Sequence, residues 1–285
     1  MAKVDKIIAS GDDIMISAED TFTGDVKDIE KRLLAEVNKI FNTIDVKNGK
    51  IQSSEDAVKF LASLEKKITD ALNKAGYNSK VKDYLKNFDA IRRNNIALHA
   101  ALNNINIPYD SLNSLTKLEV QNTVDKLLGS GISRDFIIPI RESLYRNITL
   151  GSTIQETKKT ISDYIISQDG KDSKLLRYTT QVARDSISQY DGAIQTVIKN
   201  ELDLPDYIYS GSIITDSRCQ CKYWVNKIKL PGDELEGEIQ TALDGGELGG
   251  CNCSGMIPGT TVDNFARYRG GWNCRHRAIS YNIKK

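Results

Sequence analysis

Apolar residues recur at three- and four-residue intervals through most of the chain between residues 25 and 200. In the first stretch the stripe runs through Ile29, Leu33, Val37 and Ile44. This spacing places apolar side chains on one face of an α-helix, so each stretch can bury a stripe against its neighbours. A strand would need apolar residues at every second position, and the pattern therefore predicts a mainly helical chain.

Capping residues and breakers divide this region into separate predicted helices. Ser, Thr, Asn or Asp precedes most stretches, and Gly or Pro follows several of them. The predicted helices cover 25–44, 53 to the stop at Gly76, 78 to the stop at Pro108, 111–128, 133–148, 153–167 and 173–200. We group them into a helical N-terminal region, 25–130, and a second helical region, 131–204.

The two ends of the chain differ from this pattern. Residues 1–24 show no sustained periodicity, so we predict a flexible arm there. After Pro205, the β-branched and aromatic run 207–214 predicts a strand. The middle of the acidic stretch 231–250 predicts a short amphipathic helix. The expected fold is mainly α, with helical N-terminal and middle regions and a small C-terminal α+β module, rich in cysteine, over 205–285.

Composition limits the function classes. The net charge of +1 gives no overall field toward nucleic acid or membrane. The apolar run 136–140 is far too short to cross a bilayer, and the first twenty residues lack the apolar core of a signal peptide. We therefore expect synthesis in the cytoplasm. There, clustered cysteines are more often metal ligands or redox centres than structural disulfides.

All five cysteines lie in the C-terminal module, with one of the two histidines. They form pairs separated by one residue: Cys219 with Cys221, Cys251 with Cys253, and Cys274 with His276. On an extended segment, residues i and i+2 point the same way, so each pair could offer two ligands to one ion. Thiolate and imidazole suit Zn²⁺, which binds four ligands in a tetrahedron. The predicted zinc ligands are Cys219, Cys221, Cys274 and His276, with Cys251 and Cys253 as the replacement pair. Free thiols or a disulfide are the alternatives.

Two other functions would use the same tail. A thiol enzyme could use Cys219 as nucleophile, His276 as base and Asp216 as orienting acid. No local catalytic signature accompanies these residue types, so we predict no enzyme and no catalytic residue. A zinc-stapled nucleic-acid-binding protein would instead use the basic, aromatic-rich end of the chain. The candidate phosphate contacts are Arg267, Arg269, Arg275 and Arg277.

Four pieces of the sequence carry a family resemblance. In order, they are a helix with spaced arginines (R-Y-T-T-Q-V-A-R-D-S-I-S-Q-Y, 177–190), D-S-R-C at 216–219, G-M-I-P-G-T at 255–260, and G-G-W-N-C-R-H-R at 270–277. In this order they resemble the head-morphogenesis proteins of tailed phages, the group typified by the F protein of phage Mu. The resemblance covers roughly residues 130–282. The chain departs from the family pattern at Cys221, Cys251 and Cys253, because the family has one cysteine after Asp-x-Arg and one in the closing Cys-Arg-His.

The resemblance implies a minor structural protein of the virion head, assembled in the cytoplasm of the bacterial host. Its expected partners are the portal protein, capsid or scaffold proteins, and packaged DNA, with no membrane and no small-molecule substrate. We expect Asp216, Arg218 and Arg275, together with Cys219, Cys274 and His276, to fix the fold of the module. Pro258 and Gly259 belong to the same motif set, and Trp272 is expected to pack as the anchor of the module.

Overall fold

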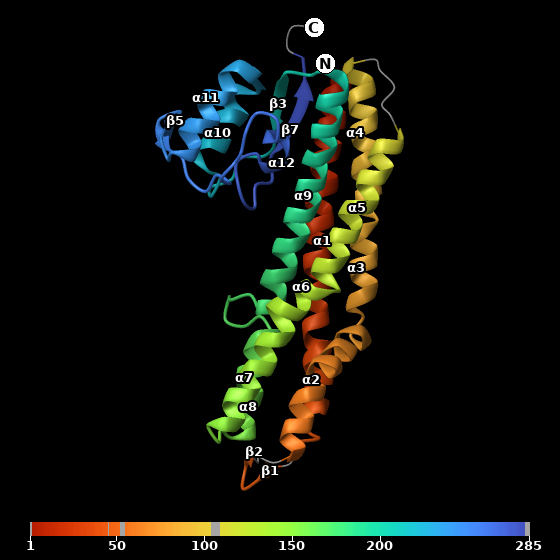
Figure 1. Ribbon diagram of the computed structural model, residues 1–285, viewed down its shortest axis with the longest axis vertical. Helices are drawn as coiled ribbons and strands as arrows, with labels where there is room; N and C mark the ends of the chain where they lie inside the picture. Colours follow the sequence, from red (N-terminus) through yellow and green to blue (C-terminus); the bar gives the residue numbers. More distant parts are fainter. Residues whose placement is uncertain (1, 45, 52–54, 104–108, 283–285) are drawn as a thin grey trace. The chain divides into compact units, whose positions relative to one another are not determined.

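The structure, a computed structural model, describes residues 2–44, 46–51, 55–103 and 109–282. It confirms the predicted mainly α fold with a small C-terminal α+β module (Figure 1). The helices are α1 (Ala2–Phe41), α2 (Glu55–Lys74), α3 (Tyr77–Leu85), α4 (Asn87–Asn103), α5 (Tyr109–Leu127), α6 (Ser130–Ile132), α7 (Ile138–Thr149), α8 (Ile154–Ile165), α9 (Lys174–Leu202), α10 (Cys219–Lys227), α11 (Gly232–Leu243) and α12 (Phe265–Tyr268), with a π-helical turn η1 (Ser133–Ile137). The strands are β1 (Val46–Lys47), β2 (Lys50–Ile51), β3 (Asp206–Ser210), β4 (Lys229–Leu230), β5 (Glu247–Leu248), β6 (Cys251–Asn252) and β7 (Arg277–Tyr281).

Residues 2–24 differ from the prediction. Instead of an irregular arm they form the first half of α1, which continues to Phe41. The buried positions in this half include Gly11, Met15, Ala18 and Phe22, so a helical stripe is present. The buried residues of this stripe are small, such as Gly11 and Ala18, or are single large side chains. The sequence therefore shows no continuous apolar repeat there. Gly11 is needed because a side chain there would collide with the guanidinium of Arg277.

The described chain forms two compact units that are not contiguous in sequence. The first comprises Met1–Ala18, Lys86–Gln121 and Arg184–Lys285, and the second comprises Glu19–Leu85 and Asn122–Ala183. The helices α1, α5 and α9 contribute residues to both units. Three of the boundaries between the units fall inside these long helices, and the fourth falls between α3 and α4, whereas the expected segments 25–130, 131–204 and 205–285 are each contiguous in sequence.

The second unit is helical, with one short hairpin. Asn48 and Gly49 form the turn between β1 and β2, both with positive φ. Its helix α8 begins with a capping box, in which Thr153 and Glu156 satisfy each other's backbone N–H groups. The predicted helix 133–148 is built as η1 followed by α7. Pro139 near the start of α7 cannot donate a backbone hydrogen bond, which accounts for the irregular turn before it.

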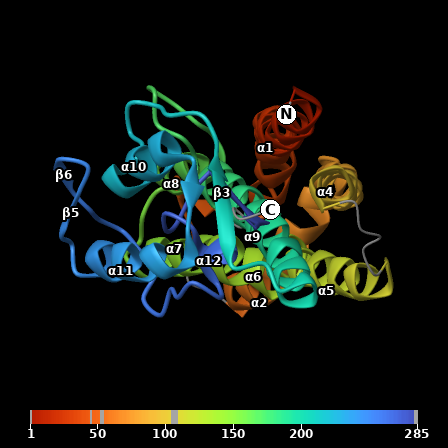
Figure 2. The same ribbon diagram turned by 90° about the horizontal axis from the view of Figure 1, so that it is seen from above.

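In the first unit, the C-terminal module is built on a three-stranded antiparallel sheet. The strand order is β4-β3-β7, and the pairing of β3 with β7 runs from Asp206 opposite Tyr281 to Ser210 opposite Arg277. The helices α10 and α11 lie beside this sheet (Figure 2). The module core gathers the buried side chains Tyr207, Tyr209, Trp224, Leu230, Leu235, Ile239 and Phe265. The predicted amphipathic helix is α11, and the predicted strand over 207–214 is β3, which ends at Ser210.

A buried ion pair joins this sheet to the helices of the first unit. Arg277, the first residue of β7, is 0% exposed. Its Nε and Nη2 donate to the two carboxylate oxygens of Asp191 in α9, at 3.1 and 3.0 Å. Nη2 also donates to Oδ1 of Asn95 in α4 at 3.0 Å, and Nη1 donates to the carbonyl of Ile8 in α1 at 3.3 Å. One guanidinium therefore contacts three helices.

The ion pair determines which carboxylate is charged. Burial favours the neutral acid at Asp191, but the charge and hydrogen bonds of Arg277, with a hydrogen bond from Asn95, hold the pKa of Asp191 below its usual value of 3.8. At Asp12 the balance is reversed: burial raises the pKa above 3.8 despite Arg277. Asp191 is therefore the principal counter-ion of Arg277.

We predict that Asp191→Ala destabilises the first unit by about 3–5 kcal/mol, because it leaves the guanidinium of Arg277 buried and unpaired. Urea denaturation followed by tryptophan fluorescence measures this, since Trp224 lies in the core of the same unit. Glu201→Ala is the matched control: it removes an exposed acid from the same helix and should change stability by no more than about 0.5 kcal/mol. Equal midpoints for the two variants would contradict the assigned role of Arg277.

Candidate metal centre

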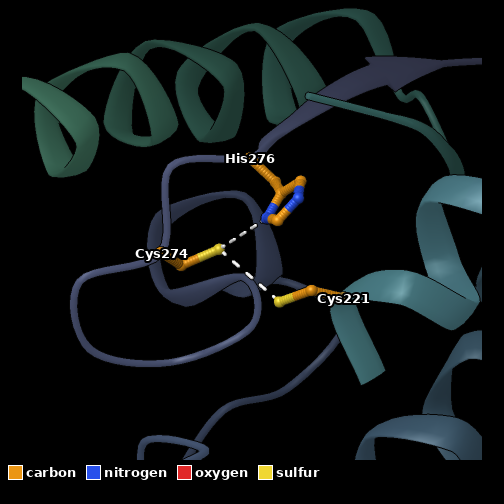
Figure 3. Close-up of side chains that lie close together, drawn as sticks. All are labelled: Cys221, Cys274 and His276. Atoms are coloured by element: carbon orange, nitrogen blue, oxygen red, sulfur yellow. Dashed lines mark hydrogen bonds between the residues drawn. The ribbon is translucent and has the colours of Figure 1, made fainter. Parts of the chain in front are cut away.

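Two cysteines and one histidine of the first unit come together in a group that could hold a metal ion. Their ligand atoms, Sγ of Cys221, Sγ of Cys274 and a ring nitrogen of His276, all lie within 4.8 Å of one another, and all three residues are buried (Figure 3). The two sulfurs are 3.9 Å apart, and Sγ of Cys274 lies 3.5 Å from Nδ1 of His276.

Two different elements position the group. Cys221 lies in the first turn of α10, whereas Cys274 and His276 lie in the loop that leads into β7 (Figure 3). Arg277 follows directly and is fixed by its ion pair, so the loop enters β7 at a defined place. The backbone N–H of Cys274 donates to the carbonyl of Gly271 at 3.2 Å and holds the turn before it.

Two of the three separations in the group suit a tetrahedral ion, and the third, between Sγ of Cys221 and the ring nitrogen of His276, is within 4.8 Å. Two thiolates bound to one zinc at about 2.3 Å each are about 3.8 Å apart, and a thiolate and an imidazole nitrogen are about 3.6 Å apart. The observed separations are 3.9 and 3.5 Å. The residue types also fit, because thiolate and imidazole are the ligands that zinc favours.

The two thiols differ in their affinity for a proton. The hydrogen bond between them raises the pKa of Cys221, and burial adds to this effect. The same hydrogen bond lowers the pKa of Cys274 well below 9, aided by His276 and Arg269 against the opposing effect of burial. Of the two thiols, Cys274 is the one that loses its proton more readily.

Tyr209 of β3 supports the group from the opposite strand. Its hydroxyl lies 3.5 Å from Sγ of Cys274 and donates to Sγ of Cys221 at 3.7 Å. Its ring stacks on the imidazole of His276, with centroids 5.5 Å apart. Gly270 leaves the necessary space, because a side chain there would collide with Sγ of Cys221. The sequence pattern does not point to Tyr209 as part of the site, since only the pairing of β3 with β7 brings it there.

A cavity of about 480 Å³ opens beside the group. Cys221, Cys274 and His276 are part of its lining. The charged residues of the lining are Asp12, Arg184, Asp216, Arg218 and Arg275. Nε2 of His276 is buried and has no hydrogen-bond partner among the residues that the structure describes.

Three of the four predicted ligands, Cys221, Cys274 and His276, come together in one group that could hold a metal ion, and the fourth does not. Cys219 does not join the group; it forms a disulfide with Cys251, with Cα atoms 5.7 Å apart. The prediction assumed an extended Cys-x-Cys segment, but α10 begins at Cys219. Residues i and i+2 of a helix do not face each other, so the two cysteines point to different partners. Neither member of the replacement pair lies in the group, since Cys253 is buried in the module core. The Cys274-x-His276 segment does bring its two side chains together, as predicted.

In this structure the proposed nucleophile of a thiol enzyme, Cys219, is not a free thiol. Its sulfur is bonded to Cys251. His276 lies beside Cys274 instead, at 3.5 Å from its sulfur. Asp216 is exposed and lines the cavity.

The predicted basic cluster does not form one surface. Arg277 and Arg269 are buried, and Arg269 donates to the carbonyl of Ser188 at 2.5 Å. Arg267 pairs with Glu119 at 3.4 Å, and Arg275 is the exposed member of the four. The sequence pattern predicts a phosphate-contacting set of arginines, whereas Arg269 and Arg277 satisfy buried partners far away in the chain.

The other predicted motif residues have mixed outcomes. Trp272 is not the anchor of the module: it is 51% exposed, whereas Trp224 is 0% exposed at the centre of the core. Arg218 does tie the module together, donating to the carbonyls of Gly270 and Trp272 at 3.2 and 2.7 Å. Pro258 and Gly259 lie in an exposed turn, in which the N–H of Thr260 donates to the carbonyl of Ile257.

The second unit carries a separate apolar groove of about 730 Å³ between α2 and α7. Val58, Tyr145 and Leu150 line it, and each is more than half exposed. Apolar surface gathered in this way is a feature of contacts with other proteins.

Comparison of the chain with family models, with curated proteins and with solved structures found no match. Among the helices in the described part of the chain, none is both long enough and apolar enough to cross a membrane.

We predict that alkylation under denaturing but non-reducing conditions labels three cysteines, Cys221, Cys253 and Cys274. Peptide mapping by mass spectrometry should find Cys219 linked to Cys251. After reduction, all five cysteines should be labelled. As a control, Cys251→Ser should leave Cys219 open to alkylation. Five labelled cysteines before reduction, in protein purified without reductant, would rule out the disulfide.

Proposed function

We propose that this chain is a minor structural protein of a tailed-phage head, which associates with the portal during head assembly. The observation that carries the proposal is the contact pattern of the four sequence pieces that resemble the head-morphogenesis family. The closing run, 270–277, touches each of the other three, although they are scattered along the chain.

Three contacts make up this pattern. Arg218 of the second piece donates to the carbonyls of Gly270 and Trp272. The backbone N–H of Asn273 donates to Asp185 of the first piece at 3.3 Å. Gly271 lies so close to the third piece that a side chain there would collide with the carbonyl of Gly255. Sequence motifs that a family shares are expected to contact one another in its common core. These contacts all lie within the first unit, and they support the resemblance.

We further propose that the ion held by Cys221, Cys274 and His276 is zinc. It would join α10 to the loop before β7, because Cys221 lies in the helix and Cys274 and His276 lie in the loop. Metal binding to such a site contributes directly to folding free energy. The proposed role is structural, and it suits a protein whose work is contact with portal, capsid or scaffold proteins.

Of the alternatives, nucleic-acid binding through the basic tail receives no support from the site. A phosphate-contacting edge needs exposed cations along one face. Two of the four candidate arginines are buried, and a third pairs with Glu119. Contact with packaged DNA would have to use another surface.

We predict about one zinc per chain in protein purified under reducing conditions, measured by elemental analysis. Cys274→Ser and His276→Gln should each lose most of this zinc, because each removes a ligand. Cys253→Ser is the matched control: it alters a buried cysteine outside the group and should keep the metal. Wild-type protein that stays free of zinc after incubation with an equimolar zinc salt would refute the assignment.

We predict that the full chain co-sediments with assembled portal oligomers from the same phage and is detected by mass spectrometry in purified heads. Portal oligomers of an unrelated phage serve as the control. Absence from heads, together with no co-sedimentation, would contradict the structural role whether or not the protein binds zinc.

A further inference from the structure

The group of three ligands lies at a cavity wall rather than inside a closed shell. Structural zinc sites have four protein ligands, whereas a site with three keeps its fourth position for water or another molecule. Here Cys221, Cys274 and His276 are three ligands, and Cys219 is held elsewhere by its disulfide. The same three residues line the cavity of about 480 Å³.

Tyr209 is the protein group nearest to a fourth ligand, and its place argues for a supporting role. Its hydroxyl contacts both sulfurs but does not line the cavity. Two thiolates already neutralise a divalent ion, so a phenolate would add an uncompensated negative charge in a fully buried place. A neutral hydroxyl that donates a hydrogen bond to thiolate sulfur avoids this cost and orients the ligands.

The charged residues that line the cavity indicate which kind of molecule could bind at the fourth coordination position of the metal. Three arginines line it, Arg184, Arg218 and Arg275, against two acids, Asp12 and Asp216. Arg218 is held in place by the carbonyls of Gly270 and Trp272. Guanidinium groups match the geometry of phosphate oxygens and bind them through charge-assisted hydrogen bonds.

We propose that a metal ion held by Cys221, Cys274 and His276 keeps its fourth position open to this cavity and binds a phosphate group there. This inference rests on the metal site of the proposed function but not on the phage assignment. One phosphate oxygen would bind the ion, and the arginine-lined wall would receive the others. Free phosphate and the terminal phosphate of a nucleic acid share this chemistry.

Cobalt replaces zinc as a visible probe in the test. The full chain is loaded with one equivalent of Co²⁺, freed of excess metal, and titrated with inorganic phosphate at constant ionic strength. The ligand-field absorption bands should shift and saturate as phosphate binds. Parallel titrations with one short oligonucleotide, with and without a 5′-phosphate, distinguish the two sources of phosphate. A shift with inorganic phosphate, or with the phosphorylated oligonucleotide alone, supports the proposal.

Arg275→Gln should raise the half-saturating phosphate concentration about tenfold, because it removes one charge-assisted contact from the exposed rim of the cavity. Arg267→Gln is the matched control: Arg267 lies outside the cavity lining, and the titration should not change.

The outcomes separate the two proposals. A chain that binds no cobalt would refute the metal site itself. Absorption bands of the cobalt-loaded chain that do not shift with any phosphate probe, but do change in Tyr209→Phe, would indicate that a group of the protein occupies the fourth coordination position. This result would overturn the proposal of an open position. Bands that respond neither to phosphate nor to Tyr209→Phe would overturn it equally.

Discussion

The buried guanidinium of Arg277 is the charge on which the arrangement of the C-terminal module depends. Removing such a group from water costs several kcal/mol unless partners replace its hydration. Asp191, Asn95 and the carbonyl of Ile8 supply those partners from three helices of the first unit. Because Cys274 and His276 lie just before Arg277, the interaction that satisfies the arginine also fixes where the thiolate and the imidazole point. The geometry of the candidate metal centre thus depends on a charge outside it.

The helix α10 is held on two sides by cysteines that are almost adjacent in sequence. Cys219 is bonded to Cys251 next to β5, whereas Cys221 faces Cys274 and His276 near β7. The rotation of successive residues around the helix sends the two sulfurs to different partners. Disulfides are rare in a reducing cytoplasm. If the protein is assembled there, as proposed, α10 is connected to the loop before β7 through Cys221, Cys274 and His276 before the disulfide between Cys219 and Cys251 forms.

The sequence predicted the features that depend on local pattern and missed those that depend on distant partners. Most helices between Glu55 and Leu202, the strand β3 and the helix α11 followed from spacing, capping and residue type. The break between α3 and α4 did not, because one continuous helix was predicted from residue 78 to Pro108. The disulfide partner of Cys219 did not follow from the sequence, because its side-chain direction depends on the segment being helical. The burial of Arg277 did not, because its counter-ion Asp191 lies 86 residues away. The choice of Trp224 over Trp272 as the core tryptophan likewise depends on packing across the sheet.

Tyr209 shows why the centre and the fold cannot be separated. It is paired with Ala278 across the β3–β7 ladder, contacts both sulfurs through its hydroxyl, and packs its ring against Trp224 and His276. A one-residue slip of β3 would turn Tyr209 to the other face of the sheet and remove all of these contacts together. The register of the sheet, the module core and the ligand geometry therefore support one another. A metal bound at this centre would stabilise the pairing of β3 with β7 as well as its own ligands, because both arrangements need Tyr209 in the same place.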